Sequence, residues 1–166
     1  RILSVTQQEI DAQFWVNRIQ NCKDLRNKLS LGMNFPTNAY RLVHGEGDLL
    51  PGLIIDIYAD TAVIQAHTDG MYLNLDAISD AIKTVFGDEI AHVYSKSSAA
   101  MHDAEIEDEF LLLVLHEVVA TENNMKFKVN WVTGQKTGFF LDQRENRQLL
   151  GHYSTGKSVL NTFSYS

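Results

Sequence analysis

Residues 134–147 read GQKTGFFLDQRENR and form the most specific run in the chain. A Lys-Thr pair stands between two glycines, two phenylalanines follow, and a dense polar cluster comes next. Asp142 and Glu145 have the spacing of a helix N-cap and the acidic partner of a capping box. We therefore predict an extended segment through the two phenylalanines, then a short helix that begins at about Gln143 and ends before Gly151.

The predicted start of this helix suits an anionic ligand group. It points free backbone N–H groups and the positive end of the helix dipole outward. Arg144 in the first turn opposes the usual dipole preference, which favours a ligand role for this side chain. An ordinary capped helix with a surface arginine is the alternative, and the local pattern taken alone favours that alternative.

Two long motifs resemble one known family. The run at 134–147, followed by KSVLNTFSYS at 157–166, resembles the start of the catalytic domain in a family of class I S-adenosylmethionine (SAM)-dependent methyltransferases. That family forms 5-methylcytosine in large-subunit ribosomal RNA. Residues 37–60, TNAYRLVHGEGDLLPGLIIDIYAD, are similar to the family's central domain. The resemblance implies SAM as the cofactor and ribosomal RNA as the partner of the complete enzyme.

The resemblance also implies which residues lie near SAM. By motif match they are Lys136, Thr137, Phe139, Phe140, Asp142, Gln143, Arg144, Asn161, Phe163 and Tyr165. Gln143 and Arg144 are the better candidates for the methionine carboxylate, because they lie at the predicted helix start. Phe139 and Phe140 can equally be core aromatics, and we expect at least one of them to be.

The catalytic groups that the resemblance implies are missing from this chain. They are a cysteine that attacks C6 of cytosine, a second cysteine that helps to release the product, and an acid that binds the cofactor's ribose. A Gly-Gly turn at the cofactor is expected just after residue 166. The single cysteine, Cys22, is in the wrong place to act as a substitute. We therefore predict no catalytic residue and no methyltransferase activity for these 166 residues alone.

Composition narrows the classes of protein. A chain of 166 residues is one domain, or one domain and part of another. It has no apolar run of membrane-spanning length and no signal peptide, so we expect no membrane partner. A single cysteine excludes an intramolecular disulfide and fits a reducing cytoplasm. The net charge of −7 argues against this piece binding RNA alone, because phosphate contacts dominate such affinity.

The periodicity predicts an α+β fold. We expect a small antiparallel or mixed sheet with two flanking helices, followed by the first helix and strand of a Rossmann-like α/β methyltransferase domain. The domain boundaries would be an N-terminal helical segment at 1–36, a central domain at 37–132, and the start of the methyltransferase domain at 133–166.

Individual elements follow from local patterns. A capping box at Thr6 and Glu9 opens a helix predicted at 7–29, and Gly87 ends one predicted at 71–86. Alternating or continuous apolar runs predict strands at 40–44, 53–58, 62–67, 90–94, 110–117 and 125–132 in the central sheet, and at 158–165 in the Rossmann-like part.

Two motifs suggest other chemistry. Residues 151–158, GHYSTGKS, satisfy the Walker A pattern, but the predicted order of helix, loop and strand is the reverse of a phosphate-binding loop. A metal site could be assembled from His102 and the nearby acidic residues Asp103, Glu105, Glu107 and Asp108. Their spacing matches no ligand pattern, so we predict a solvated acidic loop and no metal.

Three functions remain open. The first is a fragment of a cytosine-5 ribosomal RNA methyltransferase. The second is a non-catalytic protein-binding or assembly module, which the acidic balance would suit. The third, a P-loop nucleoside triphosphatase, is disfavoured by element order. An unpaired strand edge at 159–163 would also favour pairing with another copy of the chain, giving a homodimer.

Overall fold

The computed structural model describes residues 2–101 and 106–162. Its strands are β1 (Ala39–His44), β2 (Leu53–Tyr58), β3 (Thr61–Ala66), β4 (His92–Ser95), β5 (Glu109–Leu112), β6 (Glu117–Glu122) and β7 (Met125–Asn130). Its α-helices are α1 (Ala12–Lys28), α2 (Asp69–Tyr72), α3 (Leu75–Phe86), α4 (Ser98–Met101) and α5 (Arg144–Ser154). Short 3₁₀ turns are η1 (Gly45–Asp48), η2 (Gly87–Glu89) and η3 (Leu141–Gln143).

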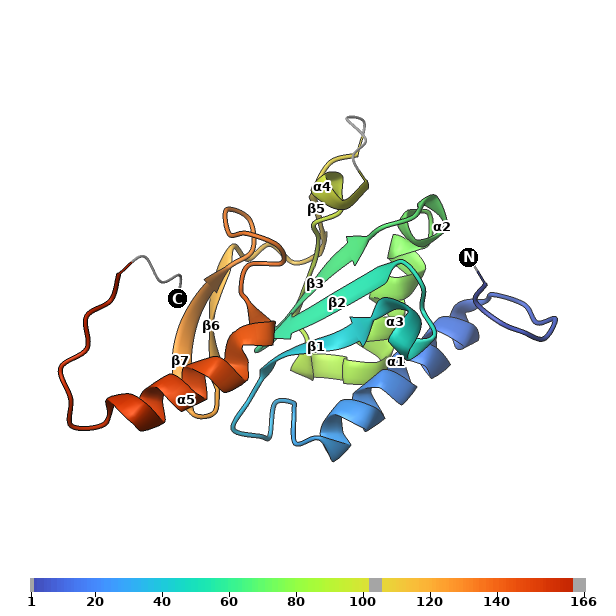
Figure 1. The fold of residues 1–166 in the computed structure, drawn as a ribbon. Helices are drawn as coiled ribbons and strands as arrows, with labels where there is room; N and C mark the ends of the chain where they lie inside the picture. Colours follow the sequence, from blue (N-terminus) through green and yellow to red (C-terminus); the bar gives the residue numbers. More distant parts are fainter. Residues whose placement is uncertain (1, 102–105, 163–166) are drawn as a thin grey trace.

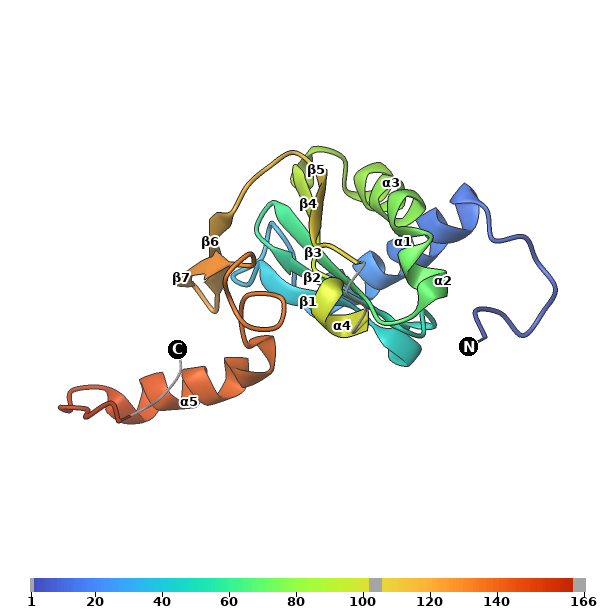
Figure 2. The same ribbon diagram turned by 90° about the horizontal axis from the view of Figure 1, so that it is seen from above.

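A five-stranded mixed sheet in the order β1-β2-β3-β4-β5 forms the centre of the molecule (Figure 1). The first three strands form the predicted antiparallel meander. β4 then lies parallel to β3, and β5 is antiparallel to β4. The helices α1 and α3 cover one face of the sheet, and α5 lies on the other side (Figures 1 and 2). The α+β fold class is therefore confirmed.

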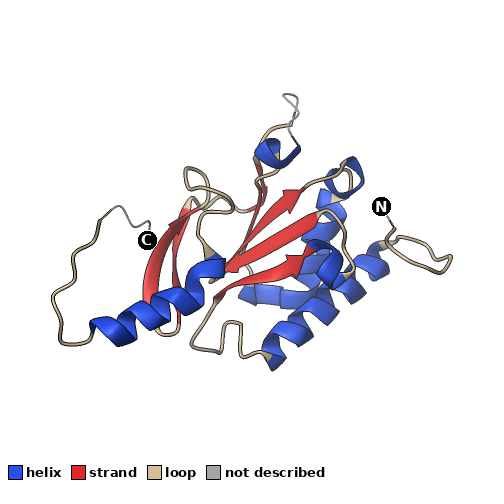
Figure 3. Cartoon of the chain, viewed as in Figure 1, coloured by secondary structure: helices blue, strands red, loops and turns tan. Residues whose placement is uncertain are grey.

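The ribbon β6-β7 is a separate two-stranded sheet beside the central one (Figure 3). The prediction that 110–117 forms one strand and that 125–132 joins the same sheet is wrong. β5 ends at Leu112, and Leu113 and Val114 are 65% and 66% exposed before β6 begins at Glu117. Leu113 has a φ of +23°, which ends the extended backbone at that point.

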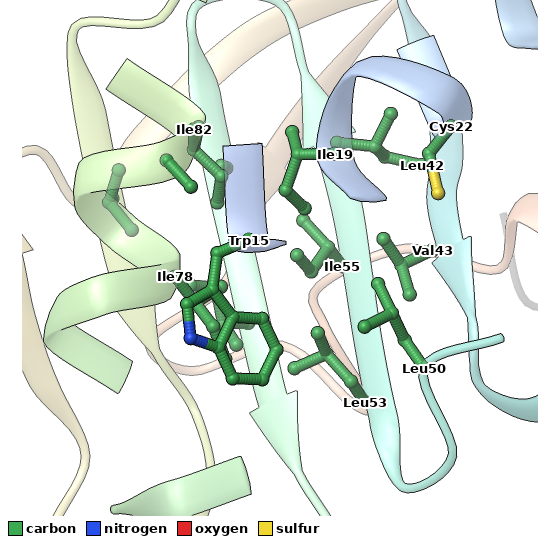
Figure 4. Close-up of a cluster of buried hydrophobic side chains, with 14 of the residues drawn as sticks. Trp15, Ile19, Cys22, Leu42, Val43, Leu50, Leu53, Ile55, Ile78 and Ile82 are labelled. Atoms are coloured by element: carbon green, nitrogen blue, oxygen red, sulfur yellow. The ribbon is translucent and has the colours of Figure 1, made fainter. Parts of the chain in front are cut away.

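Strand alternation places two different layers on the two faces of the sheet. In β2, Leu53, Ile55 and Ile57 point toward α1 and α3, whereas Asp56 and Tyr58 point to the opposite face. The first layer is the main core, in which side chains such as Trp15, Ile19, Cys22, Ile78 and Ile82 meet the sheet (Figure 4).

The second layer is smaller and includes the C-terminal part of the chain. Tyr58, Val63 and Tyr94 of the sheet pack with Trp131 and Phe139, together with Ala39, Ala120 and Val129. The segment after β7 is thus packed on the sheet face opposite the main helices.

Burial of Cys22 agrees with a structural role. Its side chain lies in the main core, and burial, with a smaller contribution from Asp48, raises the pKa of the thiol to about 11. The thiol is therefore protonated at neutral pH and is a poor nucleophile.

Helix boundaries differ from the predictions. α1 begins at Ala12 rather than residue 7, because Asp11 caps it by accepting a hydrogen bond from the Phe14 backbone N–H at 2.8 Å. The face that packs on the sheet begins only at Phe14, so nothing holds an earlier turn. Arg26 is buried on α1, whereas Leu25 is 47% exposed.

The predicted helix at 71–86 is two helices, α2 and α3. Gly87 ends α3 with a φ of +58°, as predicted. None of the helices in the described part of the chain combines the length and apolar character needed to cross a bilayer.

The prediction of a strand at 158–165 is wrong over residues 158–162, which have no regular structure. A strand needs a hydrogen-bonded neighbour, and within residues 106–162 no strand lies beside this segment. Val159 and Leu160 are 59% and 85% exposed. Phe163 and Tyr165 lie outside the described residues.

Candidate functional site

Residues 133–138 form a compact turn at the end of β7, not the predicted extended segment. The Gly134 N–H donates to the Asn130 carbonyl at 3.1 Å, and the Gly138 N–H donates to the Gln135 carbonyl at 2.8 Å. A Cβ on Gly134 would lie 2.2 Å from the Asn130 oxygen, and one on Gly138 would lie 3.0 Å from Trp131 Cα. The two glycines of the motif are therefore required by close backbone packing.

Gly134→Ala should lower the free energy of unfolding by about 2–3 kcal/mol, because the added methyl group forces the turn away from β7. Gly151→Ala is the matched control. A Cβ at Gly151 would meet nothing within 4 Å, and this residue lies inside α5. It should raise stability by about 0.5–1 kcal/mol. Urea denaturation measures the free energy of unfolding of both variants. Equal changes in the two variants would contradict the close packing proposed for Gly134.

Thr137 connects this turn to the central sheet. Its hydroxyl donates to Asp56 Oδ2 at 2.6 Å and lies 2.8 Å from the Tyr58 hydroxyl. Arg41 lies directly opposite Asp56 on β1 and donates to both of its oxygens, at 2.8 and 3.0 Å. Thr137, Asp56 and Tyr58 are all fully buried. Burial, strengthened by the Asp56 charge, raises the pKa of Tyr58.

Lys96 holds the same turn from another direction. Its ammonium donates to the backbone carbonyls of Trp131 and Gly134, both at 2.5 Å. Burial lowers the pKa of Lys96. The turn is thus fixed by one side chain from the end of β4 and by two from β2.

Arg147 fixes the helix α5. It donates to both oxygens of Glu122 on β6, at 2.7 and 2.6 Å, and to the Phe140 carbonyl at 2.9 Å. Its guanidinium carbon also lies 4.4 Å from the centre of the Phe139 ring. Glu122 is fully buried. This arginine therefore joins α5, the ribbon and the glycine turn.

The start of α5 differs from the predicted capping box. Asp142 lies in the 3₁₀ turn η3, and Gln143 is the N-cap, without a side-chain capping bond. The helix then continues through Gly151 to Ser154, four residues beyond the predicted end. The prediction of a helix here is confirmed, whereas its capping residue and its end are wrong.

A cleft of about 440 Å³ lies between the sheet edge at β1 and the segment that leads into α5. Four of the ten residues predicted from the motif line it, namely Lys136, Phe139, Asp142 and Arg144. Strand β1 contributes Tyr40, Arg41 and His44, and α1 contributes Arg26. The structure therefore brings the motif together with β1 and the C-terminal part of α1.

The other predicted residues lie elsewhere. Thr137 is buried within the hydrogen-bond network, and Phe139 is 7% exposed in the second core layer, so the expectation of a core aromatic is confirmed. Phe140 is half-buried, with the Lys136 ammonium 4.4 Å from its ring centre. Gln143 and Asn161 are exposed.

Sequence reasoning missed Asp56, Lys96, Glu122 and Arg147. Asp56 gave one signal, since it is a carboxylate inside the apolar strand LIIDIY. Such a residue needs a partner when it is buried. The other three gave none, because their partners are backbone carbonyls or residues distant in sequence.

The two other motifs gain no support. Gly151 and Ser154 of the Walker-like run lie within α5, and the residues described after it, 155–162, form no helix that could hold phosphates. His102, Asp103 and Glu105 lie outside the described residues. Within 2–101 and 106–162, no three His, Cys, Asp or Glu side chains gather so as to hold a metal ion.

Curated proteins resemble the chain along nearly all of its length. It is 40% identical over 172 aligned positions to the ribosomal RNA large subunit methyltransferase I of Vibrio parahaemolyticus, an alignment covering 100% of the chain and 42% of that protein. It is 34% identical to the protein of the same name from Aeromonas salmonicida, covering 96% of the chain and 41% of that protein. The chain thus spans less than half the length of these relatives. No protein-family model matches it.

Solved structures agree with these relatives. A protein from Streptococcus mutans assigned as a SAM-dependent methyltransferase superposes with a TM-score of 0.75 at 25% identity, covering 90% of this chain and 38% of that one. A crystal structure of a protein assigned as a methyltransferase, complexed with SAH, superposes with a TM-score of 0.74 at 25% identity, covering 90% and 37%. In sequence and in fold, this chain is therefore similar to part of the proteins named as ribosomal RNA large subunit methyltransferases and SAM-dependent methyltransferases.

Proposed function

We propose that this chain is part of a SAM-dependent ribosomal RNA methyltransferase, and that the complete protein forms 5-methylcytosine in large-subunit RNA in the cytoplasm. The observation that carries the proposal is the match of 96–100% of the chain to methyltransferases of that name. The chain alone is inactive in this proposal, because its one cysteine is buried and protonated.

Methyl transfer from labelled SAM to large-subunit ribosomal RNA tests the proposal. The RNA should come from cells that lack the corresponding gene, and digestion to nucleosides identifies the methylated base. The complete gene product should yield 5-methylcytidine, whereas this chain alone should yield none. A different labelled nucleoside would overturn the assigned reaction, and activity of the chain alone would overturn its inactivity.

Two secondary expectations belong to the same proposal. The alternative function is a non-catalytic protein-binding module, which absence of methyl transfer by the complete protein would favour. Self-association is expected through the exposed apolar residues near Val159 and Leu160. Sedimentation that gives a monomer at high concentration would contradict a homodimer.

The motif residues with accessible side chains are the ones we propose for SAM contacts. Arg144 is half-buried at the cleft, at the N-terminal end of α5. Thr137 and Phe139 instead support the turn from inside, because both are buried. The remaining assignments, Lys136, Phe140, Asp142, Gln143, Asn161, Phe163 and Tyr165, stay proposals by motif match.

Arg144→Ala in the complete protein should weaken SAH binding about tenfold or more, because a hydrogen bond to a charged group contributes roughly 1.5–3 kcal/mol. It should cost at most about 1 kcal/mol of stability, since the partner of Arg144, Glu145, is an exposed neighbour 3.2 Å away. Calorimetry with SAH and urea denaturation measure the two effects. A larger loss of stability than of binding free energy would make Arg144 structural.

A further inference from the structure

The cleft beside β1 gathers cationic groups in a chain whose net charge is −7. They come from separate parts of the sequence: Arg26 from α1, Arg41 from β1, Lys136 from the glycine turn and Arg144 from the start of α5. The imidazole of His44, at the end of β1, lines the cleft beside them. Figure 1 shows the start of α5 beside the end of the sheet formed by β1 and β2. One acidic side chain, Asp142, lines the same cleft.

A β-bulge in β1 turns two of these groups toward the cleft. The strand register shifts between Arg41 and Val43, so Val43 joins Leu42 in the main core. His44 then falls on the same side as Arg41, and Arg41 Nη1 lies 3.4 Å from His44 Nδ1. Without the bulge, alternation would point Arg41 and His44 to opposite faces.

The carboxylates behind the cleft neutralise only its inner cations. Asp48 pairs with Arg26 at 2.5 Å; burial would raise the pKa of Asp48, but Arg26 and the His44 N–H lower it below its ordinary value. Asp56 pairs with Arg41. Among the described residues, neither Lys136 nor Arg144 pairs with a buried carboxylate. At the outer wall Arg144 pairs with the exposed Glu145 and Asp142 also lines the cleft, so Lys136 is the cation there that has no carboxylate partner among the described residues.

We propose that this cleft binds a backbone phosphate of an RNA strand, contacted by His44 and Lys136 at the outer wall and by Arg41 Nη1 behind them. The inference rests on the proposed function, which supplies RNA as the substrate. A volume of about 440 Å³ suits a nucleotide-sized group. Phosphate oxygens accept from arginine, lysine and imidazole donors, and such contacts dominate RNA affinity.

Lys136→Gln and His44→Gln test the cleft without threatening the fold, because both side chains are exposed. Lys126→Gln is the matched control, since it removes the same charge from an exposed lysine on β7 that does not line the cleft. Binding of the complete protein, with and without each substitution, to a fluorescein-labelled single-stranded RNA is measured by fluorescence anisotropy at several salt concentrations.

We expect Lys136→Gln and His44→Gln each to weaken RNA binding roughly threefold to tenfold, and Lys126→Gln to leave it unchanged. Loss of the Lys136 contact should also lower the slope of log K against log salt by roughly 0.7, the value for one phosphate of a single strand. Equal losses in Lys136→Gln and Lys126→Gln, or no RNA binding by the unchanged complete protein, would overturn the proposal.

Calorimetry with SAH separates the two anions that this cleft could accept. If Lys136→Gln weakens binding of SAH but not of RNA, the cleft holds the cofactor carboxylate and the phosphate assignment is wrong. The methyl-transfer assay distinguishes a failure of the proposed methyltransferase function from a failure of the phosphate assignment. Methyl transfer by the complete protein, with RNA affinity unchanged in the cleft variants, would overturn the cleft assignment alone.

Discussion

Arg41→Met should lower the free energy of unfolding by about 3–5 kcal/mol. Asp56, the partner of Arg41, is fully buried, and the guanidinium donates to both of its oxygens. Methionine replaces most of the buried stem of arginine but leaves the carboxylate charge without its cation. Removing one member of a buried pair costs more than the pair contributes, because the remaining charge is desolvated and uncompensated.

The complementary substitution, Asp56→Asn, should cost less, about 1–2 kcal/mol. The Arg41 side chain is 35% exposed, so its guanidinium can turn toward water when the carboxylate is absent. The asparagine carbonyl can still accept from the Thr137 hydroxyl, which donates to Asp56 at 2.6 Å.

Urea denaturation of Arg41→Met, Asp56→Asn and the double variant at pH 7 gives the two losses and their coupling. The double variant should lose less than the sum of the single variants, since both act on one interaction. If Arg41→Met lowers the free energy of unfolding no more than Asp56→Asn does, the burial of the unpaired Asp56 carboxylate is not what destabilises the Arg41→Met variant.

The sequence predicted the central meander of β1, β2 and β3 well, because the residues within each strand are sufficient to indicate it. β2 has the predicted bounds, Leu53–Tyr58; β1 differs from prediction by one residue at its start, and β3 by one residue at each end. Each is a short β-rich run bounded by turn residues, and alternation along it agrees with burial on two faces. The evidence for the end of α3 at Gly87 was equally local, since the positive φ at which a helix ends favours glycine.

Elements that depend on distant partners were not predictable in this way. The apolar run at 110–117 contains the end of β5, an exposed link and the first residue of β6, and hydrophobicity does not change at the point where the chain leaves the sheet. The segment at 158–162 has a strand-like composition but no neighbouring strand within the described residues. A strand forms only when it pairs with a neighbouring strand, so the sequence of one segment cannot specify it alone.

The sequence singled out the motif at residues 134–147 but did not reveal the contacts that shape it. The run was expected to be extended through the two phenylalanines, whereas Gly134 and Gly138 lie in a compact turn that permits backbone contact with residues 130 and 131. The hydrogen bond from Thr137 to Asp56, which is 81 residues away in sequence, was not foreseen either. The bulge that turns His44 into the cleft depends on pairing with β2 and leaves no mark in the local pattern.

Arg147→Met should lower the free energy of unfolding by about 3–5 kcal/mol and release α5 from the ribbon. Glu122 is fully buried and receives two hydrogen bonds from Arg147, whose own side chain is only 16% exposed. The substitution leaves that carboxylate unpaired and removes the bond to the Phe140 carbonyl. Since no residue of α5 is buried, little apolar contact remains to hold the helix in place.

Arg144→Met is the matched control for this prediction, because it removes an arginine from the same helix. Its ion pair with Glu145 joins sequence neighbours, and the Glu145 side chain is 72% exposed, so the loss should be at most about 1 kcal/mol. Urea denaturation measures the stabilities, and hydrogen exchange measures the protection of the amides in α5. In Arg147→Met these amides should exchange faster, whereas the amides of β2 should keep their order of protection. Unchanged exchange in α5 would mean that the Arg147–Glu122 pair does not hold the helix. The glycine turn alone would then position Arg144 at the wall of the cleft.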